Sequence, residues 1–408
     1  MPDIQNSTRE KMKNILLSSA AIALLAGAAS AEVTWSGDAE IGYNDDYEDG
    51  FYWDAGLYIN MSQELNNGWT ASASLDIDLE DSSQGSTFKL GDVDSSDWVV
   101  SISNDMFGLS FGDVDTAYAS FKGVSALYDN DFFAPMDEAA DLQDFIDEQV
   151  DNGTLPALGA PSVDGGLLLT AEYGNYSAAA SVVSVDGDTD ETGQIALAAD
   201  FGMFTAGLFY AENVIFYGLP YDDTIVDGID DMTVLSLGAS FGGADFTASV
   251  MDFAGETGYG LEVAYPVGPV TLGAYYASYD MPFYGSEEAY GVSVDYSDGP
   301  LTVAAYFEED FVGAQEYAIE GQYDFGMGLV VTAGYIDGDD DGTLGALDGD
   351  DDYATYIVAE YDLGGGASFL ASYADANSVA AESTDDIDTG IGGYELYSGA
   401  TVSLSFSF

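Results

Sequence analysis

The segment Trp69–Glu80, with the sequence WTASASLDIDLE, decides the fold class of this chain. Its odd-numbered positions hold Trp, Ala, Leu and Ile, whereas its even-numbered positions hold Thr, Ser, Asp and Glu. Successive side chains of a β-strand point to opposite faces, so this period of two predicts a strand with one apolar and one polar face. The same alternation recurs in residues 33–43, 290–296 and 401–408. The chain is therefore predicted to be all-β and to contain many amphipathic strands.

Short turns join these strands in pairs, and most of them contain glycine, which adopts the positive φ of a tight hairpin without strain. Nine such hairpins, with a first and a last strand, predict a sheet of 20 strands. The turns lie at 66–68, 106–108, 174–175, 202–203, 242–243, 267–269, 298–300, 326–328 and 364–366. Longer acidic loops are expected at 81–95, 186–192, 212–231, 280–287, 337–352 and 374–393. Short connections at one end and long loops at the other are typical of an up-and-down transmembrane β-barrel.

The composition excludes several classes of function. Among 408 residues, 74 are acidic and 5 are basic, which gives a formal net charge of −69. Nucleic-acid binding needs a basic face and is therefore not expected. The chain contains neither His nor Cys, which removes His- or Cys-dependent catalysis, the usual zinc ligands and disulfides, so no enzyme activity is expected. Hydrophobic residues make up 47% of the chain, too many for a disordered protein.

A soluble β-sandwich would show the same alternation, but the polar faces here carry carboxylates with almost no cations to pair them. About twenty strands also exceed what most sandwiches contain. In a membrane barrel the apolar faces meet lipid and the polar faces meet a water-filled lumen, and closure leaves no open sheet edge. The acids predicted to face this lumen are Glu40, Asp76, Asp78, Glu80, Glu172, Glu262, Asp295, Glu320 and Glu360.

The N-terminal segment has the features of a secretory signal peptide. From Met12 it reads MKNILLSSAAIALLAGAASA, an apolar stretch behind basic residues that ends in the small-residue motif at 29–31. The apolar part is too short to span a bilayer as a helix. We therefore expect an over-extended N-terminus at 1–11, a signal peptide at 12–31 and a barrel domain at 32–408.

The sequence resembles the alphaproteobacterial general outer-membrane porins of the Rhodobacter type. The resemblance rests on EVTWSGDAEIGY at 32–43, on FGDVDTA at 111–117 before a long internal loop, on YDLGGGASFLASYAD at 361–375 and on the terminal FSF. It implies homotrimers of 16-stranded barrels in the outer membrane of a Gram-negative cell, in contact with lipid and lipopolysaccharide. It also implies diffusion pores narrowed by an in-folded third loop, and a terminal Phe408 read by the barrel-assembly machinery.

Two features depart from that family pattern. The hairpin count predicts up to 20 strands, whereas the resemblance implies 16. The resemblance also implies a cluster of arginines across the constriction, but the segment from residue 32 onward contains no Arg and keeps only Lys89 and Lys122 as cations. The electric field across the pore must therefore differ from the one that the resemblance implies.

Residues 117–165 separate two alternating segments, and so long a loop in a compact fold is usually functional. By position this loop corresponds to the constriction loop of the resembled family, and its aromatic residues favour packing into the lumen over an exposed acidic loop. A faint helical period runs through residues 136–150. The residues expected at the constriction are Asp129, Asp131, Asp137, Glu138, Asp141, Asp144, Asp147, Glu148 and Lys122.

One acidic loop has the spacing of a calcium-binding loop. Oxygen side chains recur at positions 1, 3, 5, 7 and 12, with Gly at position 6, and oxygen ligands at these spacings can wrap one Ca²⁺. The twelfth residue is Asp where Glu is usual, and the flanking segments are predicted strands, so diffuse screening by divalent cations is favoured over a discrete site. The residues concerned are Asp337, Asp339, Asp341, Thr343 and Asp348.

The sequence thus predicts a passive channel without a cofactor for ions and small hydrophilic solutes, with a preference for cations. Lumen carboxylates in a low-dielectric frame concentrate cations and repel anions. Two alternatives remain: a substrate-specific channel, for example for sugars, and a surface barrel that does not conduct.

Overall fold

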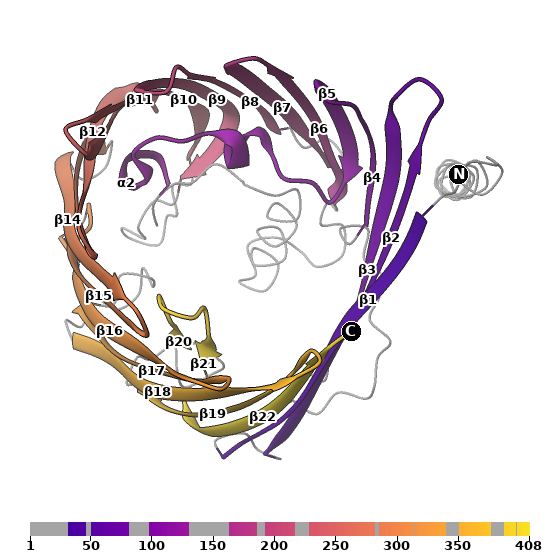
Figure 1. Cartoon of the computed structure of the whole chain (residues 1–408). Helices are drawn as coiled ribbons and strands as arrows, with labels where there is room; N and C mark the ends of the chain where they lie inside the picture. The colour runs from indigo at the N-terminus through magenta and orange to yellow at the C-terminus, as the bar shows by residue number, and fades with distance from the viewer. Residues whose placement is uncertain are drawn as a thin grey trace, which may run out of the picture.

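Twenty antiparallel strands form one sheet that closes on itself, because β1 pairs with both β2 and β22 (Figure 1). The computed structural model describes residues 32–45, 50–80, 98–129, 163–185, 192–216, 228–281, 285–311, 313–339, 351–376, 387–396 and 398–408. The first ten strands are β1 Glu32–Asn44, β2 Phe51–Glu64, β3 Thr70–Glu80, β4 Trp98–Ser103, β5 Phe107–Gly112, β6 Val163–Tyr173, β7 Tyr176–Val185, β8 Thr192–Asp200, β9 Phe204–Phe216 and β10 Gly228–Phe241. The other ten are β11 Ala244–Phe253, β12 Glu256–Val267, β13 Val270–Met281, β14 Gly285–Asp298, β15 Leu301–Glu309, β16 Gln315–Gly326, β17 Leu329–Asp339, β18 Asp351–Gly364, β19 Ala367–Ala376 and β22 Gly399–Ser407.

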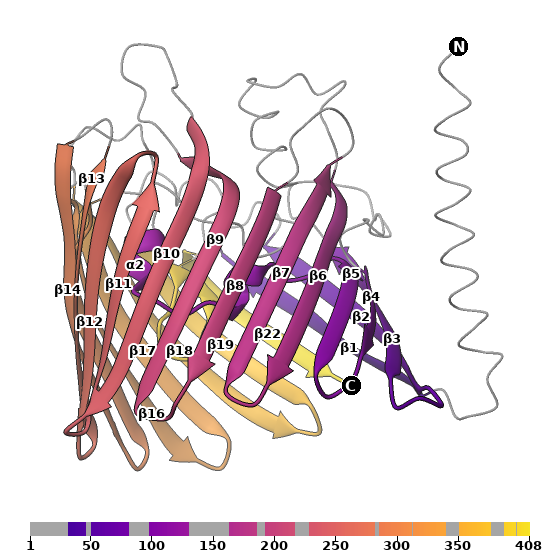
Figure 2. The same cartoon turned by 90° about the horizontal axis from the view of Figure 1, so that it is seen from above.

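The predicted number of strands is confirmed at 20, and the 16 implied by the resemblance is wrong for this chain. All nine predicted turns join neighbouring strands of the barrel wall, although the turn predicted at 106–108 lies at 104–106, because β5 already begins at Phe107. They gather at one end of the barrel, with every strand tilted against its axis (Figure 2).

Several long loops are shorter than predicted because strand pairing continues into them. Gly228 still pairs with Phe216, and Gly285 still pairs with Met281. Likewise Asp339 pairs with Asp351. The polar composition of these segments led to their assignment as loops, but backbone pairing does not require an apolar face.

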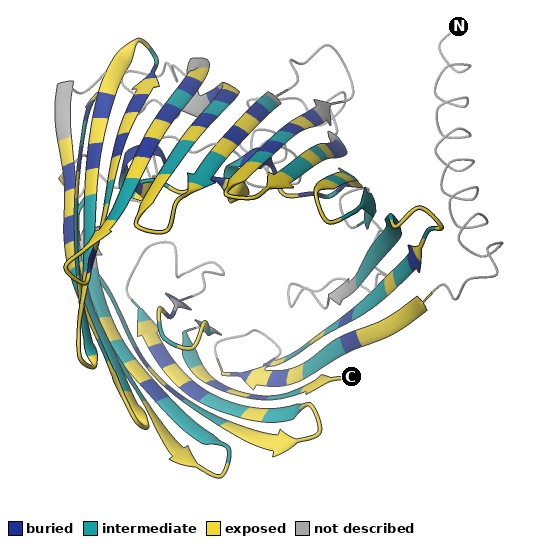
Figure 3. Ribbon diagram, turned by 45° about the horizontal axis from the view of Figure 1, so that its top comes forward, coloured by how far each residue is buried: buried dark blue, intermediate teal, exposed yellow. Residues whose placement is uncertain are grey.

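Exposed and buried residues alternate along the strands (Figure 3). On β12, for example, Tyr259 is 58% exposed whereas the adjacent Gly258 and Gly260 are buried. Large apolar side chains on the outward face remain uncovered all around the barrel, which is the surface that lipid would cover. Aromatic residues such as Tyr173, Phe241 and Phe325 mark its short-turn end. None of the helices in the described part of the chain is long and apolar enough to span a bilayer.

Two short segments of the described residues lie inside the barrel, on opposite sides of the interior (Figure 1). The first follows β5 and contains the 3₁₀ turn η1 (Ala117–Ser120) and the single-turn helix α2 (Ser125–Tyr128). The second is a hairpin of β20 (Ile387–Asp388) and β21 (Glu395–Leu396) between β19 and β22. The in-folding of the loop after β5 is thereby confirmed for its described part, whereas the second segment was not predicted.

Candidate functional site

The segment 117–128 is attached to the inner wall of the barrel by an apolar cluster. Phe121, Val124 and Leu127 are almost fully buried, although all three lie in a connection between strands. Their partners are inward-facing side chains of the wall, which explains why this part of the lumen is apolar. The wall residues of this cluster are Ala179, Ala196, Phe209, Ala211, Val214, Met232, Val234, Met251, Phe253, Ala277, Tyr279 and Ala289.

Two glycines of β12 make room for this segment. A side-chain carbon at Gly260 would lie 2.8 Å from the Cβ of Val124, and one at Gly258 would lie 2.7 Å from a methyl carbon of Leu127. Both distances are shorter than any ordinary carbon–carbon contact. The wall is therefore shaped to receive these side chains.

Polar side chains of the wall bind the backbone of the same segment. Ser181 Oγ accepts from the N–H of Ala117 at 2.8 Å, and Ser249 Oγ accepts from the N–H of Val124 at 3.0 Å. Gln194 Oε1 accepts from the N–H of Tyr118 at 3.0 Å. These buried donors would otherwise lose their hydrogen bonds to water at a cost of roughly 1–3 kcal/mol each. The segment is thus held in one position relative to the wall.

Burial also changes the acidity of a group in this segment. It raises the pKa of Tyr128 to about 12, with the nearby Asp129 and Glu262 adding to the shift. The phenol is consequently neutral over the whole physiological range and acts here as part of the packing.

Several carboxylates of the wall are paired with tyrosine hydroxyls. Tyr52 donates to Glu40 at 2.8 Å, and Glu40 also accepts from Ser405 Oγ at 2.6 Å. Tyr275 donates to Glu308 at 3.0 Å. Hydrogen bonds to a charged acceptor are stronger than neutral ones, so they stabilise these carboxylates. The remaining pairs of this kind are Tyr306 with Glu316, Tyr356 with Glu320 and Tyr394 with Glu360.

Two predicted lumen acids lie next to α2. Glu262 on β12 is half-buried and Asp295 on β14 is exposed. Both line a cavity of about 260 Å³ together with Ser125 and Thr271. Their carboxylates and the in-folded segment thus border the same water-accessible space.

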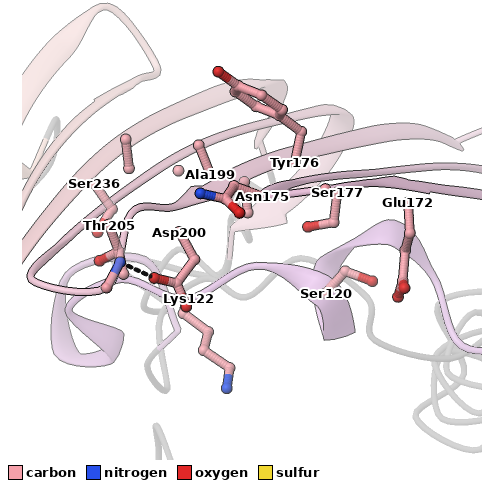
Figure 4. Close-up of a pocket in the computed structure, with 15 residues that line it drawn as sticks. Ser120, Lys122, Glu172, Asn175, Tyr176, Ser177, Ala199, Asp200, Thr205 and Ser236 are labelled. Carbon is pink, nitrogen blue, oxygen red and sulfur yellow. Dashed lines mark hydrogen bonds between the residues drawn. The ribbon is translucent and has the colours of Figure 1, made fainter.

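A larger cavity of about 640 Å³ lies between the in-folded segment and the wall near the short-turn end. Lys122 lines it and is exposed, and its side chain points away from the labelled wall residues (Figure 4). Glu172 and Asp200 lie on the wall side of this cavity, where the carboxylate of Asp200 accepts from the N–H of Gly202 at 2.7 Å. Two acids therefore line the wall side of this cavity, and the ammonium group of Lys122 extends away from them.

The other predicted residues are distributed as follows. Asp129 is exposed directly after α2, Asp76 is half-buried at an inward position of β3, and Asp78 and Glu80 lie farther along that strand. The remaining predicted constriction acids lie outside the described residues: Asp131, Asp137, Glu138, Asp141, Asp144, Asp147 and Glu148. The helical period at 136–150 lies outside them as well.

Of the predicted calcium ligands, Asp337 and Asp339 end β17, and Tyr335 donates its hydroxyl to Asp337. Asp341, Thr343 and Asp348 lie outside the described residues. Within the described part of the chain, no group of three or more acidic, His or Cys side chains could hold a metal ion.

Sequence reasoning missed the tyrosine partners of the acids and the hairpin of β20 and β21. Tyr306 lies on the same face of its strand as Thr302 and Glu308, so alternation alone could have placed its ring in the lumen. The hairpin has a weaker sequence signal, which is the glycine-rich run Gly390-Ile-Gly-Gly393 between Ile387 and Leu396.

Comparison with known proteins agrees with this architecture. The sequence matches the model of the Gram-negative porin family over residues 18–288, well over half of the chain. A search of curated proteins found no match. Among solved structures, one engineered variant of Rhodopseudomonas blastica porin is 18% identical with a TM-score of 0.44, and the alignment covers 72% of this chain and 98% of that protein. A triple variant of the same porin is 17% identical with a TM-score of 0.45, covering 71% and 98%. On the match to its family model, this chain belongs to the Gram-negative porins, the β-barrel channels of the outer membrane.

Proposed function

We propose that this porin is a water-filled diffusion channel that prefers cations and admits ions and small hydrophilic solutes without strong specificity. The observation that carries the proposal is the row of carboxylates on inward strand positions, of which Glu40, Glu262 and Asp295 are examples. The hydrogen-bond partners of Glu40 are the neutral hydroxyls of Tyr52 and Ser405, which stabilise its charge without cancelling it.

The mechanism needs no chemical step. Carboxylates inside a low-dielectric frame create a negative potential that raises the local concentration of cations and lowers that of anions. Counter-ions screen this potential over a Debye length of about 10 Å at 0.1 M salt and ~3 Å at 1 M. Selectivity should therefore be strong in dilute salt and weak in concentrated salt.

The decisive experiment is a single-channel recording of the purified barrel in a planar bilayer with a tenfold KCl gradient. A cation-preferring pore gives a reversal potential near the Nernst potential of K⁺ in dilute salt, which moves toward zero when both solutions are concentrated. A reversal potential of the anion sign would refute the proposal, and absence of conductance would favour a surface barrel instead.

The same proposal extends to export and assembly. Residues 12–31 would serve as a cleaved signal peptide after an over-extended start at 1–11, and 32–408 would form the barrel. We further propose that it is a Rhodobacter-type porin that forms homotrimers, contacts lipopolysaccharide and is recognised through Phe408 by the barrel-assembly machinery. Divalent cations such as Ca²⁺ would screen the acidic loops diffusely. N-terminal sequencing of the outer-membrane form and chemical crosslinking in native membranes test these points.

A further inference from the structure

The hairpin of β20 and β21 lies inside the barrel and has hydrogen bonds of its own. Ile387 pairs with Leu396 across it, and the N–H of Thr389 donates to the carbonyl oxygen of Tyr394 at 3.0 Å. The hydroxyl of Thr389 in turn accepts from the N–H of Tyr394 at 2.9 Å. Its turn therefore has a defined conformation of its own.

Two wall carboxylates bind this hairpin from β16 and β18. The N–H of Gly390 donates to Glu320 at 2.9 Å, and the hydroxyl of Tyr394 donates to Glu360 at 2.9 Å. A side-chain carbon at position 390 would lie 2.5 Å from a Glu320 oxygen, so a larger residue there would displace this carboxyl group. The hairpin and the wall thus match in shape and in hydrogen bonding.

An apolar cluster adds to these two hydrogen bonds. Ile387 and Leu396 are nearly fully buried against Tyr356, Val358 and Ala374 of the wall. Burying an aliphatic side chain of this size stabilises the packed state by about 1.5–3 kcal/mol. The hairpin should consequently stay in the lumen while the channel conducts.

The hairpin changes which groups of the wall a solute can reach. Glu320 is only 5% exposed, because Tyr356 and Gly390 cover its carboxylate. This acid lies at an inward strand position, as the sequence predicts, but it is shielded from the lumen. In this buried position the carboxyl group of Glu320 keeps two hydrogen bonds, one from the hydroxyl of Tyr356 and one from the N–H of Gly390.

We infer that residues 387–396 form a second constriction element, which narrows the pore from the β16–β18 wall, across the interior from η1, and shields Glu320 from passing ions. This inference rests on the proposed channel function. The two in-folded segments lie on opposite sides of the barrel interior (Figure 1), so the size and charge of the pore depend on both. One in-folded loop alone would leave the β16–β19 wall and its carboxylates open to solutes.

Labelling a single cysteine tests this inference, since the chain contains no other Cys. Ile391→Cys places a thiol at the turn of the hairpin, and Met327→Cys places one in a short turn where the side chain is 93% exposed. A bulky, positively charged methanethiosulfonate reagent should cause a stepwise loss of single-channel conductance in Ile391→Cys and none in Met327→Cys. Mass spectrometry of each protein confirms that both thiols have reacted.

A second variant releases the hairpin instead of blocking it. Ile387→Ser combined with Leu396→Ser removes the apolar anchors, and it should raise the conductance and increase the preference for cations as Glu320 becomes accessible. If the labelled Ile391→Cys barrel and the double variant both conduct like the wild type, the hairpin is not a constriction. If the wild-type barrel does not conduct at all, the proposed channel function fails, and the role of the hairpin in it fails with it.

Discussion

Gly37 and Phe408 lie directly against each other where the barrel closes. The N–H of Gly37 donates to the carbonyl oxygen of Phe408 at 2.9 Å, and the N–H of Phe408 donates back to Gly37 at 2.8 Å. A side-chain carbon at position 37 would lie 3.0 Å from the phenyl ring and 2.6 Å from the carbonyl oxygen of Gly56. The last residue of the chain therefore completes the β1–β22 seam at a position where only glycine fits.

Gly37→Val should weaken this seam. The added carbons would displace the Phe408 ring or the neighbouring strand, and overpacking of this kind costs about 1–3 kcal/mol. The temperature at which the folded band disappears from a detergent gel should fall. Gly321→Val is the matched control, because the nearest atom to a side-chain carbon there is 3.9 Å away. An equal shift in both variants would mean that valine on a strand, and not the seam, is responsible.

Deletion of Phe408, or its replacement by Ser, should impair outer-membrane assembly. The variant loses the terminal hydrogen bonds with Gly37 and also the apolar end residue that we propose as the recognition signal. The level of folded protein in isolated outer membranes measures the effect. Refolding in detergent separates the two causes, because a variant that refolds normally in vitro but fails in cells lacks recognition only. Wild-type levels in the membrane would contradict the prediction.

Gly260→Val should displace α2 from the wall. The new side chain would occupy the space of Val124, and the bond from its N–H to Ser249 would be strained. Because the in-folded segment then moves toward the pore axis or leaves the lumen, the single-channel conductance should change while the barrel still assembles. Gly321→Val again serves as the control, with an unchanged conductance. A Gly260→Val channel identical to the wild type would show that this segment does not limit the pore.

The strands of the barrel wall could be predicted from sequence because the signals for strands and turns lie in short, local stretches of sequence. Alternation places a residue such as Glu262 on the inward face, and a motif such as Gly364-Gly-Gly366 marks a turn, without any knowledge of distant partners. Each added turn adds two strands, so the count of 20 follows from the turns. Resemblance to a family gave 16, because similarity of motifs does not fix the number of hairpins.

The interior could not be predicted in the same way because it depends on contacts between distant segments. Glu320 has an inward position like that of Glu262, yet its exposure is decided by Gly390, which lies 70 residues farther along the chain. Likewise, the local sequence does not distinguish Gly258 from any other glycine on a strand, and only the structure shows that Leu127 packs against it. The odd or even position of a residue along a strand assigns its side chain to one face of the sheet, but it does not show what covers that face.

Glu262→Gln combined with Asp295→Asn should reduce the preference for cations. Both acids border the cavity beside α2, so removing two charges there weakens the potential that solutes meet. In a dilute KCl gradient the reversal potential should move toward zero, and the difference from the wild type should vanish at 1 M salt. Asp252→Asn, an exposed and outward-facing position on β11, is the control and should leave the reversal potential unchanged.

The hairpin of β20 and β21 should loosen at alkaline pH. Burial, together with the hydrogen bond to Glu360, raises the pKa of Tyr394 to about 12 from its ordinary value of 10. A group whose pKa is raised by folding contributes its full stabilisation below the ordinary value and loses it as the pH rises through the raised one. Between pH 10 and 12 the phenol of the docked hairpin keeps its proton, whereas the phenol of a released hairpin ionises, so rising pH increasingly favours release from Glu360.

The conductance should consequently rise reversibly over this interval in short recordings at pH 9 to 12. Glu320 also binds this hairpin, by accepting from the N–H of Gly390. The donor of this bond is a backbone group that keeps its proton, so the bond does not change over the interval. Tyr394→Phe has no proton to lose, so its conductance should stay constant over the same interval. An identical rise in Tyr394→Phe would assign the transition to the strands, whereas a flat wild-type profile would show that the bond to Glu360 does not hold the hairpin in place.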